Sequence, residues 1–260
     1  MKQPYHILFR LFGTRLQRSK SVHFVTISKR RFKRIILRDC YLASEIERNL
    51  ECFGASEHFP SLITRYDNEI WVEFIDGARI RKNDVNERFV EKIAELYATV
   101  YARRPRLLDV TEFPFPVRLH QDLRFLNQVR VLGDQIYQEL DRTAEHLTPK
   151  QVWVGFDYID PVLKNFVMAR NSGQVYAVDV ESLQDNQLIG TGVARARVSW
   201  LEAFLDRFFD RLERKGVPDF RSYFPFVELY FLARWTKMWF LEKKWKRIDP
   251  ALFERFRDFY

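Results

Sequence analysis

A pair of short apolar runs in the middle of the chain constrains the fold most strongly. The runs extend from Val162 to Met168 and from Gln174 to Val180, and Asn171-Ser172-Gly173 stands between them. These three residue types favour tight turns, each for its own backbone or hydrogen-bonding reason. Two apolar runs joined by such a turn predict a β-hairpin.

Three polar residues are placed around this predicted hairpin. Asp160 stands just before the first run, Asn165 follows five residues later, and Asp179 closes the second run. Singly they are ordinary, because Asp before Pro161 favours a turn, Asn can cap a turn and Asp can end a strand. In this order they match a kinase-type phosphotransferase site, where one carboxylate meets the substrate hydroxyl. An amide and a second carboxylate there hold Mg²⁺ against the ATP phosphates.

Two segments carry a resemblance to a known family. The segment YIDPVLKN (residues 158–165) resembles the catalytic loop of the protein-kinase-like superfamily, and VDVE (residues 178–181) resembles its metal-binding Asp motif. The Asp-any-Glu form is similar to that of aminoglycoside and choline phosphotransferases and of lipopolysaccharide core (Kdo and heptose) kinases. The chain departs from the family pattern at Tyr158, where His is usual, and at Ile159, where Gly or Arg is usual.

The resemblance implies a two-lobed α+β fold of the protein-kinase-like type. A small β-rich N-lobe with one helix is expected over residues 1–76 and a larger, mainly helical C-lobe over residues 77–260, together forming one kinase-like domain. The periodicity of apolar residues agrees with this division. The expected strands are Val22–Lys29, Arg34–Arg38, Ser61–Arg65 and Glu69–Phe74; the expected helices are Cys40–Phe53, Asp84–Ala102, Leu123–Leu147 with a break near Gly133, Val198–Leu212 and Phe226–Trp245; a basic turn is expected at Lys29–Lys33, irregular structure at Arg103–Val117 and a loop at Gly190–Gly192.

The resemblance also implies roles for individual residues. Asp160 would orient the acceptor hydroxyl and accept its proton, while Asn165 and Asp179 would coordinate Mg²⁺. Lys164 would neutralise the transferring phosphoryl group, because one type of tyrosine kinase has an arginine at the same distance from its catalytic aspartate. The alternative for Lys164 is a surface lysine at the mouth of a strand. Glu181 would bind a second metal or orient Asp179.

The expected nucleotide contacts begin with a basic residue on a strand. Members of the superfamily use a strand lysine that contacts the α/β-phosphates and pairs with a helix glutamate. Arg38 takes the place of this lysine at the end of the RIILR segment, although arginine keeps only the charge and not the geometry. Glu47 is the expected partner, with Glu45 and Glu51 as competitors, and solvated helix charges are the plainer interpretation of all three.

Two further segments complete the expected ATP site. Trp71 to Ile80 is similar to the hinge of small-molecule kinases, so Glu73 and Ile75 are expected to contact the nucleotide. Gly13 to Ser21 would cover the phosphates, but it holds one glycine and no GxGxxG pattern. Basic and hydroxyl side chains would then do what backbone amides do elsewhere.

Composition narrows the class of partner and compartment. The net charge of +8 and the pI near 9.5 favour anionic partners, namely nucleotide phosphates, phosphorylated glycans, an anionic membrane face or nucleic acid. We expect no nucleic-acid partner, because no nucleic-acid-binding module is visible. Cys40 and Cys52 alone imply neither a disulfide framework nor a zinc site. With no secretory signal and no membrane span in the sequence, a cytoplasmic protein is expected.

Basic and aromatic residues interleave from Phe231 to Arg247. The favoured interpretation is a core helix with a solvated end. A second interpretation is an element at the anionic inner surface of a membrane, with Trp at the interface and Lys or Arg beside the head groups. Nucleic-acid binding is the third.

The sequence thus leads to two hypotheses about function. The first is ATP- and Mg²⁺-dependent phosphoryl transfer to a hydroxyl of a small molecule or glycan, with a lipopolysaccharide core sugar as the first candidate acceptor. The second is a pseudokinase, a nucleotide-binding or scaffold protein that keeps the fold. Tyr158, Arg38 in the lysine position and the absent Gly-rich loop favour the second, and the retained Asp160-Asn165-Asp179 set favours the first.

Overall fold

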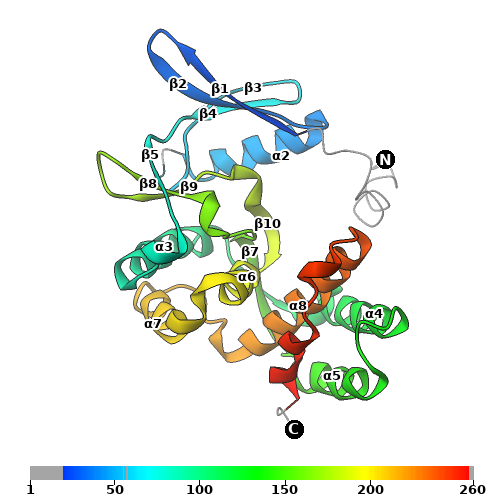
Figure 1. The fold of residues 1–260 in the computed structure, drawn as a ribbon. Coiled ribbons are helices and arrows are strands. Elements are labelled where there is room, and N and C mark those ends of the chain that lie inside the picture. Colours follow the sequence, from blue (N-terminus) through cyan, green and yellow to red (C-terminus); the bar gives the residue numbers. More distant parts are fainter. Residues whose placement is uncertain (1–19, 55, 57, 258–260) are drawn as a thin grey trace.

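The computed structural model describes residues 20–54, 56 and 58–257. Within this range, a β-rich N-terminal part is followed by a mainly helical C-terminal part, which confirms the expected fold class (Figure 1). The segment from Gly13 to Ser21, expected to cover the phosphates, lies outside the described residues except for its last two positions.

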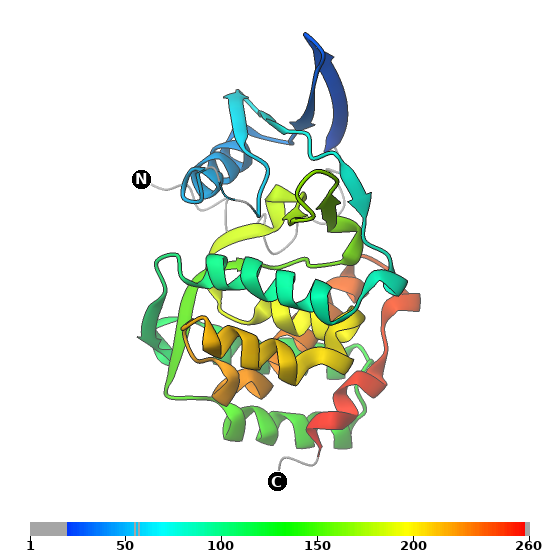
Figure 2. The ribbon, with the colours of Figure 1, turned by 90° about the vertical axis from the view of Figure 1, so that its left-hand side faces the viewer.

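A four-stranded antiparallel sheet forms most of the N-terminal part, with the strand order β1-β2-β4-β3. Its β1–β2 hairpin projects at the top of the molecule in Figures 1 and 2. Helix α2 lies beneath the sheet and begins at the N-cap Asp39, whose side chain accepts a hydrogen bond from the backbone N–H of Leu42 (2.9 Å). The strands are β1 Ser21–Ile27, β2 Arg30–Ile36, β3 Leu62–Tyr66 and β4 Glu69–Glu73, and the helix is α2 Cys40–Glu51.

The turn of the first hairpin differs from the expectation. Ser28 and Lys29 form it, both with positive φ (49° and 67°), and β2 begins at once with Arg30. The basic turn predicted at Lys29–Lys33 is therefore wrong. A hairpin turn with two positive φ angles usually carries Asn or Gly, so Ser-Lys gave no recognisable signal. As a result Lys33 lies inside the strand and Arg38 lies beyond its end.

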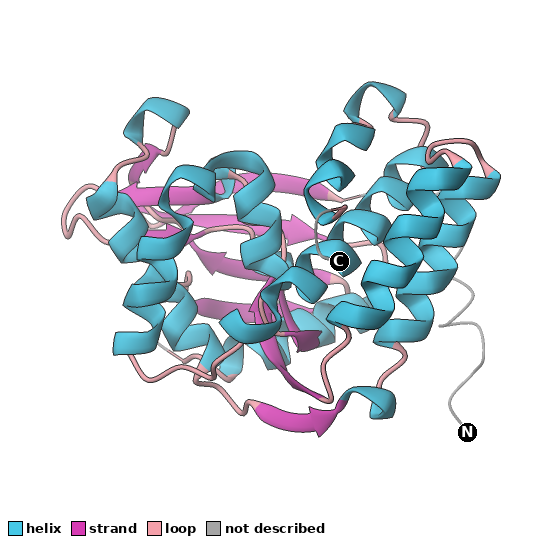
Figure 3. Cartoon of the chain, turned by 90° about the horizontal axis from the view of Figure 1, so that it is seen from below, coloured by secondary structure: helices cyan, strands magenta, loops and turns pink. Residues whose placement is uncertain are grey.

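The C-terminal part surrounds two small antiparallel sheets with helices, as the view from below in Figure 3 shows. One sheet has the order β5-β8-β9 and contains the predicted hairpin, which is confirmed in shorter form. The other has the order β10-β7-β6. The elements are β5 Gly77–Arg79, α3 Glu87–Tyr101, β6 Arg106–Asp109, α4 Phe115–Gln128, α5 Asp134–Leu147, β7 Gln151–Tyr158, β8 Phe166–Ala169, β9 Val175–Ala177, β10 Leu183–Leu188, α6 Thr191–Ala196, α7 Leu205–Arg214 and α8 Phe224–Leu241.

Several boundaries in this part differ from the predicted ones. Helix α3 is capped by Asn86 rather than Asp84, and β6 lies in the stretch expected to be irregular. The break near Gly133 is confirmed, since it separates α4 from α5. The predicted helix Val198–Leu212 is interrupted, because a π-helical turn and a 3-10 turn precede α7. The predicted loop Gly190–Gly192 is instead the start of α6.

The basic-aromatic segment is divided between core and surface. Helix α8 is buried over most of its first three turns, in agreement with the core-helix interpretation. Trp235 and Trp239 are half-buried, whereas Trp245 is 51% exposed next to exposed Lys246. No helix in the described part of the chain combines the length and apolarity that crossing a bilayer requires. Contact with an anionic membrane stays a prediction.

One buried carboxylate joins three elements at the centre of the molecule. Asp157 of β7 accepts hydrogen bonds through Oδ2 from the backbone N–H groups of Gly190 (3.1 Å) and Gly192 (3.0 Å). Its Oδ1 accepts one from the Tyr101 hydroxyl of α3 (3.2 Å). Burial raises the pKa of Asp157 to about 7, although these hydrogen bonds act in the opposite direction. Asp157 therefore holds the start of α6 against β7.

This contact leaves no room for a side chain at Gly192. A methyl group there would lie 2.2 Å from the Tyr158 carbonyl oxygen and 2.6 Å from the Tyr97 hydroxyl. We predict that Gly192→Ala lowers the free energy of unfolding by ~2 kcal/mol or more, because the backbone must shift. Gly133→Ala is the control, since nothing lies within 4 Å of its added methyl. Chemical denaturation measures both variants, and equal stability of the two would contradict the close approach.

Candidate active site

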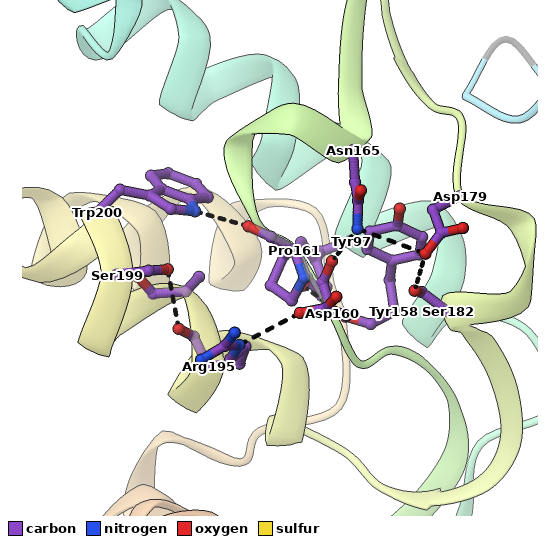
Figure 4. Close-up of polar contacts among 11 residues, drawn as sticks. Tyr97, Tyr158, Asp160, Pro161, Asn165, Asp179, Ser182, Arg195, Ser199 and Trp200 are labelled. Carbon is purple, nitrogen blue, oxygen red and sulfur yellow. Dashed lines mark hydrogen bonds and ion pairs between the residues drawn. The ribbon is translucent and has the colours of Figure 1, made fainter. Parts of the chain in front are cut away.

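The loop after β7 is fixed by hydrogen bonds on both sides (Figure 4). The Pro161 carbonyl accepts one from the Trp200 indole N–H (2.7 Å), and the Asp160 carbonyl accepts one from the Asn165 side-chain amide (2.9 Å). The Tyr97 hydroxyl donates to the Tyr158 carbonyl (2.9 Å). The backbone that carries Asp160 is thus held in one conformation while its carboxylate remains partly exposed.

Asn165 and Asp179 lie together at the base of the predicted hairpin. The Asn165 amide nitrogen is 3.5 Å from Asp179 Oδ2, and the Ser182 hydroxyl donates to the same oxygen (2.9 Å). Of the three residues expected to converge on one cleft, Asp160, Asn165 and Asp179, only Asn165 and Asp179 bring their side chains together there. Asp160 joins them through its backbone carbonyl, whereas its carboxylate faces a neighbouring cavity.

A cleft of about 550 Å³ lies between the N-terminal sheet and the hairpin. Glu73 and Ile75, the expected hinge contacts, line it together with Asn165 and Asp179. Its wall combines apolar side chains with basic ones. The apolar lining is Val22, Phe24, Pro60, Phe74, Val167 and Val178, and the basic lining is Lys20, Arg31, Lys33, Arg79 and Lys164.

Lys33 of β2 is the strand lysine that reaches this cleft, and the sequence interpretation missed it. Its ammonium group donates to the Val178 carbonyl (2.6 Å), one residue before Asp179. Burial lowers the pKa of Lys33 to about 8, and the charges of Lys20 and Arg79 act in the same direction. Asp179 partly opposes this by favouring the ammonium form. Burial in the cleft therefore destabilises the charged form of Lys33.

Arg38 and Glu47, chosen for the nucleotide site, lie elsewhere. The Arg38 guanidinium donates to Asp39 (2.9 Å) at the start of α2, and the Glu47 carboxylate accepts a hydrogen bond from Arg65. Neither residue lines the large cleft. The predicted position of the hairpin turn explains the error. With the turn predicted at Lys29–Lys33, Lys33 falls outside the strand and Arg38 becomes the expected basic residue of the strand.

Lys20, just before β1, contacts the carboxylates of the VDVE motif. Its ammonium group lies 3.1 Å from Asp179 Oδ1 and also pairs with Glu181. Burial raises the pKa of Asp179, but the charge and hydrogen bond of Lys20, with the Ser182 hydroxyl and Lys33, outweigh it and hold the pKa below its usual range. Asp179 is therefore ionised at neutral pH.

A second cavity of about 340 Å³ lies on the other side of the loop. Asp160 lines it, and the Arg195 guanidinium of α6 donates to Asp160 Oδ1 (3.3 Å). Lys164 lines both this cavity and the large cleft, so this one residue borders the two hollows. Arg195 is the second site residue that the sequence interpretation missed, since nothing near it in the chain marks it as special.

The side chains of Asn165 and Asp179 suit a magnesium ion. Both offer hard oxygen atoms to the large cleft, and the carboxylate is ionised. Within the described residues no group of three or more His, Cys, Asp or Glu could hold a metal. Two protein ligands agree with the usual behaviour of Mg²⁺, which keeps several waters and binds substrate phosphates rather than a full protein cage.

Tyr158 occupies a core position rather than a catalytic one. Its side chain is fully buried, with ring centroids 5.7 Å from Phe166 and 6.2 Å from Phe59. Burial raises its pKa well above the usual value, and the nearby charges of Asp179 and Asp160 add to this. Tyr in place of the usual His therefore changes the packing beneath the loop. It leaves Asp160, Asn165 and Asp179 in place.

Comparison with known proteins identifies the fold. No protein-family model and no curated sequence matches the chain. Solved structures do match: choline kinase LicA from Streptococcus pneumoniae (13% identity, TM-score 0.62, 98% of each chain) and macrolide 2'-phosphotransferase MphH from Brachybacterium faecium (10%, 0.59, 97% of this chain and 95% of that one). A third is aminoglycoside phosphotransferase APH(4)-Ia with ADP and hygromycin B (11%, 0.58, 98% and 97%). The chain has the protein-kinase-like fold.

The depressed pKa of Lys33 makes stability depend on pH. The unfolded chain binds a proton at this lysine more readily than the native state, so the native state is penalised below pH 8 and the penalty fades toward pH 10.5. We predict that Lys33→Met stabilises the protein at pH 7 relative to wild type, by up to about 3 kcal/mol, and that this gain shrinks by pH 9.5. Lys246→Met, at an exposed site, is the control. Thermal unfolding at both pH values gives the result, and parallel pH slopes for Lys33→Met and wild type would refute it.

Proposed function

We propose that this protein is an ATP-dependent phosphotransferase that phosphorylates a hydroxyl group of a small molecule or glycan. One observation carries the proposal: Lys164 lines both hollows of the site. The first holds Lys33, Asn165 and Asp179, and the second holds Asp160. A phosphoryl group that moves from a nucleotide in the first to an acceptor in the second passes the Lys164 ammonium group.

The large cleft has the composition that a nucleotide needs. Apolar side chains such as Phe74 and Ile75 can cover the base, while the Lys33 ammonium group can contact phosphate oxygens. The phosphates would in turn stabilise the charged form of Lys33, which burial disfavours in their absence. Structural neighbours solved with AMP or ADP support this assignment.

Asn165 and Asp179 would hold Mg²⁺ at the phosphate end of the cleft. When bound, the metal supplies positive charge that neutralises the phosphate oxygens. Lys20, which pairs with Asp179 and Glu181, must then give up part of its contact.

Asp160 acts on the acceptor. Arg195 binds Oδ1 of this carboxylate and fixes its direction, which leaves Oδ2 to accept the hydroxyl proton. The acceptor oxygen forms a bond to the γ-phosphorus, and the bond from that phosphorus to the bridging oxygen breaks, with its electron pair leaving on ADP. Lys164 lies where it neutralises the charge on the transferring group.

The acceptor we favour within this class is a sugar of a lipopolysaccharide core. The resemblance of residues 178–181 to the motif of core kinases supports it, and the basic lining of the second cavity suits an acidic core sugar such as Kdo. The structural neighbours act on other molecules, and their names include choline, macrolide and aminoglycoside substrates.

A nucleotide-binding protein without catalysis is the second candidate. The observation that favours it is the ion pairing of Lys20 with Asp179 and Glu181, which places a protein cation beside the proposed metal ligands. The two candidates differ in one respect: only a phosphotransferase needs the Asp160 carboxylate.

Substitutions at the two aspartates should therefore fail in different ways. Asp179→Ala should abolish the Mg²⁺-dependent part of ATP binding, because the metal loses its carboxylate ligand. Asp160→Ala should leave ATP affinity nearly unchanged and slow phosphoryl transfer by roughly 10²–10⁴-fold, the usual contribution of a positioned general base. Lys164→Ala should lower turnover more than affinity. Calorimetry with Mg²⁺–ATP and turnover with a glycan extract as acceptor source provide the measurements.

Asp185→Ala, at an exposed position of β10, is the control and should change neither quantity. If the wild-type protein binds no Mg²⁺–ATP, the proposed phosphotransferase activity is contradicted. If wild type binds it but turnover is indifferent to Asp160→Ala, the non-catalytic candidate stands instead.

A further inference from the structure

The second cavity has an excess of positive charge at the place where the acceptor would bind. Four basic residues and two carboxylates line it. Asp160 is paired with Arg195, and the other carboxylate, Glu242, is paired with Lys244. Among the described residues, Lys164 and Arg247 have no carboxylate within ion-pair distance. The cavity is thus left with two uncompensated cations.

Its aromatic wall is already occupied by a cation of the protein. The Arg195 guanidinium lies 3.3 Å from the centroid of the Trp235 ring and 5.9 Å from that of Trp239. Ligands with a quaternary ammonium group bind on such aromatic faces. Here Arg195 covers them and adds its own charge, so a cationic acceptor would meet repulsion in place of an aromatic surface.

The basic groups that line the cavity come from separate parts of the chain. Lys164 stands at the border with the large cleft, whereas Lys244 and Arg247 come from the segment after α8. Because Asp160, Lys244 and Arg247 line the same cavity, an acceptor that fills it with a hydroxyl at Asp160 also reaches Lys244 and Arg247. The volume of about 340 Å³ lies at the small end of ligand pockets, which suits a single sugar-sized unit.

We propose that the acceptor is an anionic polyol, a hydroxyl compound that also carries a phosphate or carboxylate group. Arg247 binds its anionic group together with Lys244, which gives up part of its contact with Glu242, and this sets the hydroxyl against Asp160. Charge-assisted hydrogen bonds from both residues supply the specificity. This inference rests on the proposed function, because only a phosphotransferase has an acceptor. The anion site itself can be tested without nucleotide.

The test is calorimetric titration at low salt with four probes: glucose, glucuronate, glucose 6-phosphate and glucosamine. We expect one or both anions to bind at least about tenfold more tightly than glucose, and glucosamine to bind no better than glucose. Tighter binding of glucose 6-phosphate identifies a phosphate group, and tighter binding of glucuronate a carboxylate. Equal affinity for glucose and both anions, or a preference for glucosamine, would overturn the inference.

A matched pair of double variants separates the cavity from the general charge of the protein. Lys244→Gln with Arg247→Gln removes two cations that line the cavity, whereas Lys243→Gln with Lys246→Gln removes two exposed neighbours that do not. The first variant should lose the anion preference and the second should keep it. Equal loss in both, or no loss in the first, contradicts a built site.

A thermal-shift measurement with ATP on the same protein tests the proposed function separately from the anion site. Stabilisation by ATP without any anion preference would leave the proposed function intact and overturn this inference alone. Anion preference without stabilisation by ATP would support the site and overturn the proposed function.

Discussion

The hydrogen bonds of one buried carboxylate position the loop that carries Asp160 and the helix that carries Arg195. Asp157 lies three residues before Asp160 on the same strand and loop, and it binds the first backbone N–H groups of α6, the helix that carries Arg195. These hydrogen bonds hold together the two segments that form the Asp160–Arg195 pair. Burial opposes ionisation of Asp157, so the contact depends on every donor around it, including the Tyr101 hydroxyl.

The two parts of the molecule are joined by similar contacts, and these also shape the cleft. Asn49 of α2 donates to the Leu183 carbonyl of β10 (2.9 Å) in a buried position, and Lys33 of β2 donates to the Val178 carbonyl (2.6 Å). The first contact binds the helix of the N-terminal part to the C-terminal part. The second places a half-buried ammonium group beside Asp179 at a cost in stability. Strain or unfavourable burial of this kind is typical of sites kept for ligand binding.

The sequence predicted those features of the site that have a local sequence pattern, and it did not predict those that depend on tertiary contacts. The hairpin and its polar residues Asn165 and Asp179 were found because turn residues and apolar runs are short-range features. Lys33 was missed since the Ser28–Lys29 turn has left-handed backbone angles without Gly or Asn, which displaced the predicted strand toward Arg38. Arg195 had no local signal, because its role follows from tertiary contacts with Asp160 and Trp235.

The central claim is that phosphoryl transfer takes place beside Lys164, the residue that borders the two hollows. A crystal structure with Mg²⁺ and a non-hydrolysable ATP analogue tests this most directly. The account predicts that the base lies against Phe74 and Ile75, that the metal is bound by Asn165 and Asp179, and that the γ-phosphate lies beside Lys164 and faces Asp160. An analogue bound outside the large cleft, or with its γ-phosphate directed away from Lys164 and Asp160, would contradict the account.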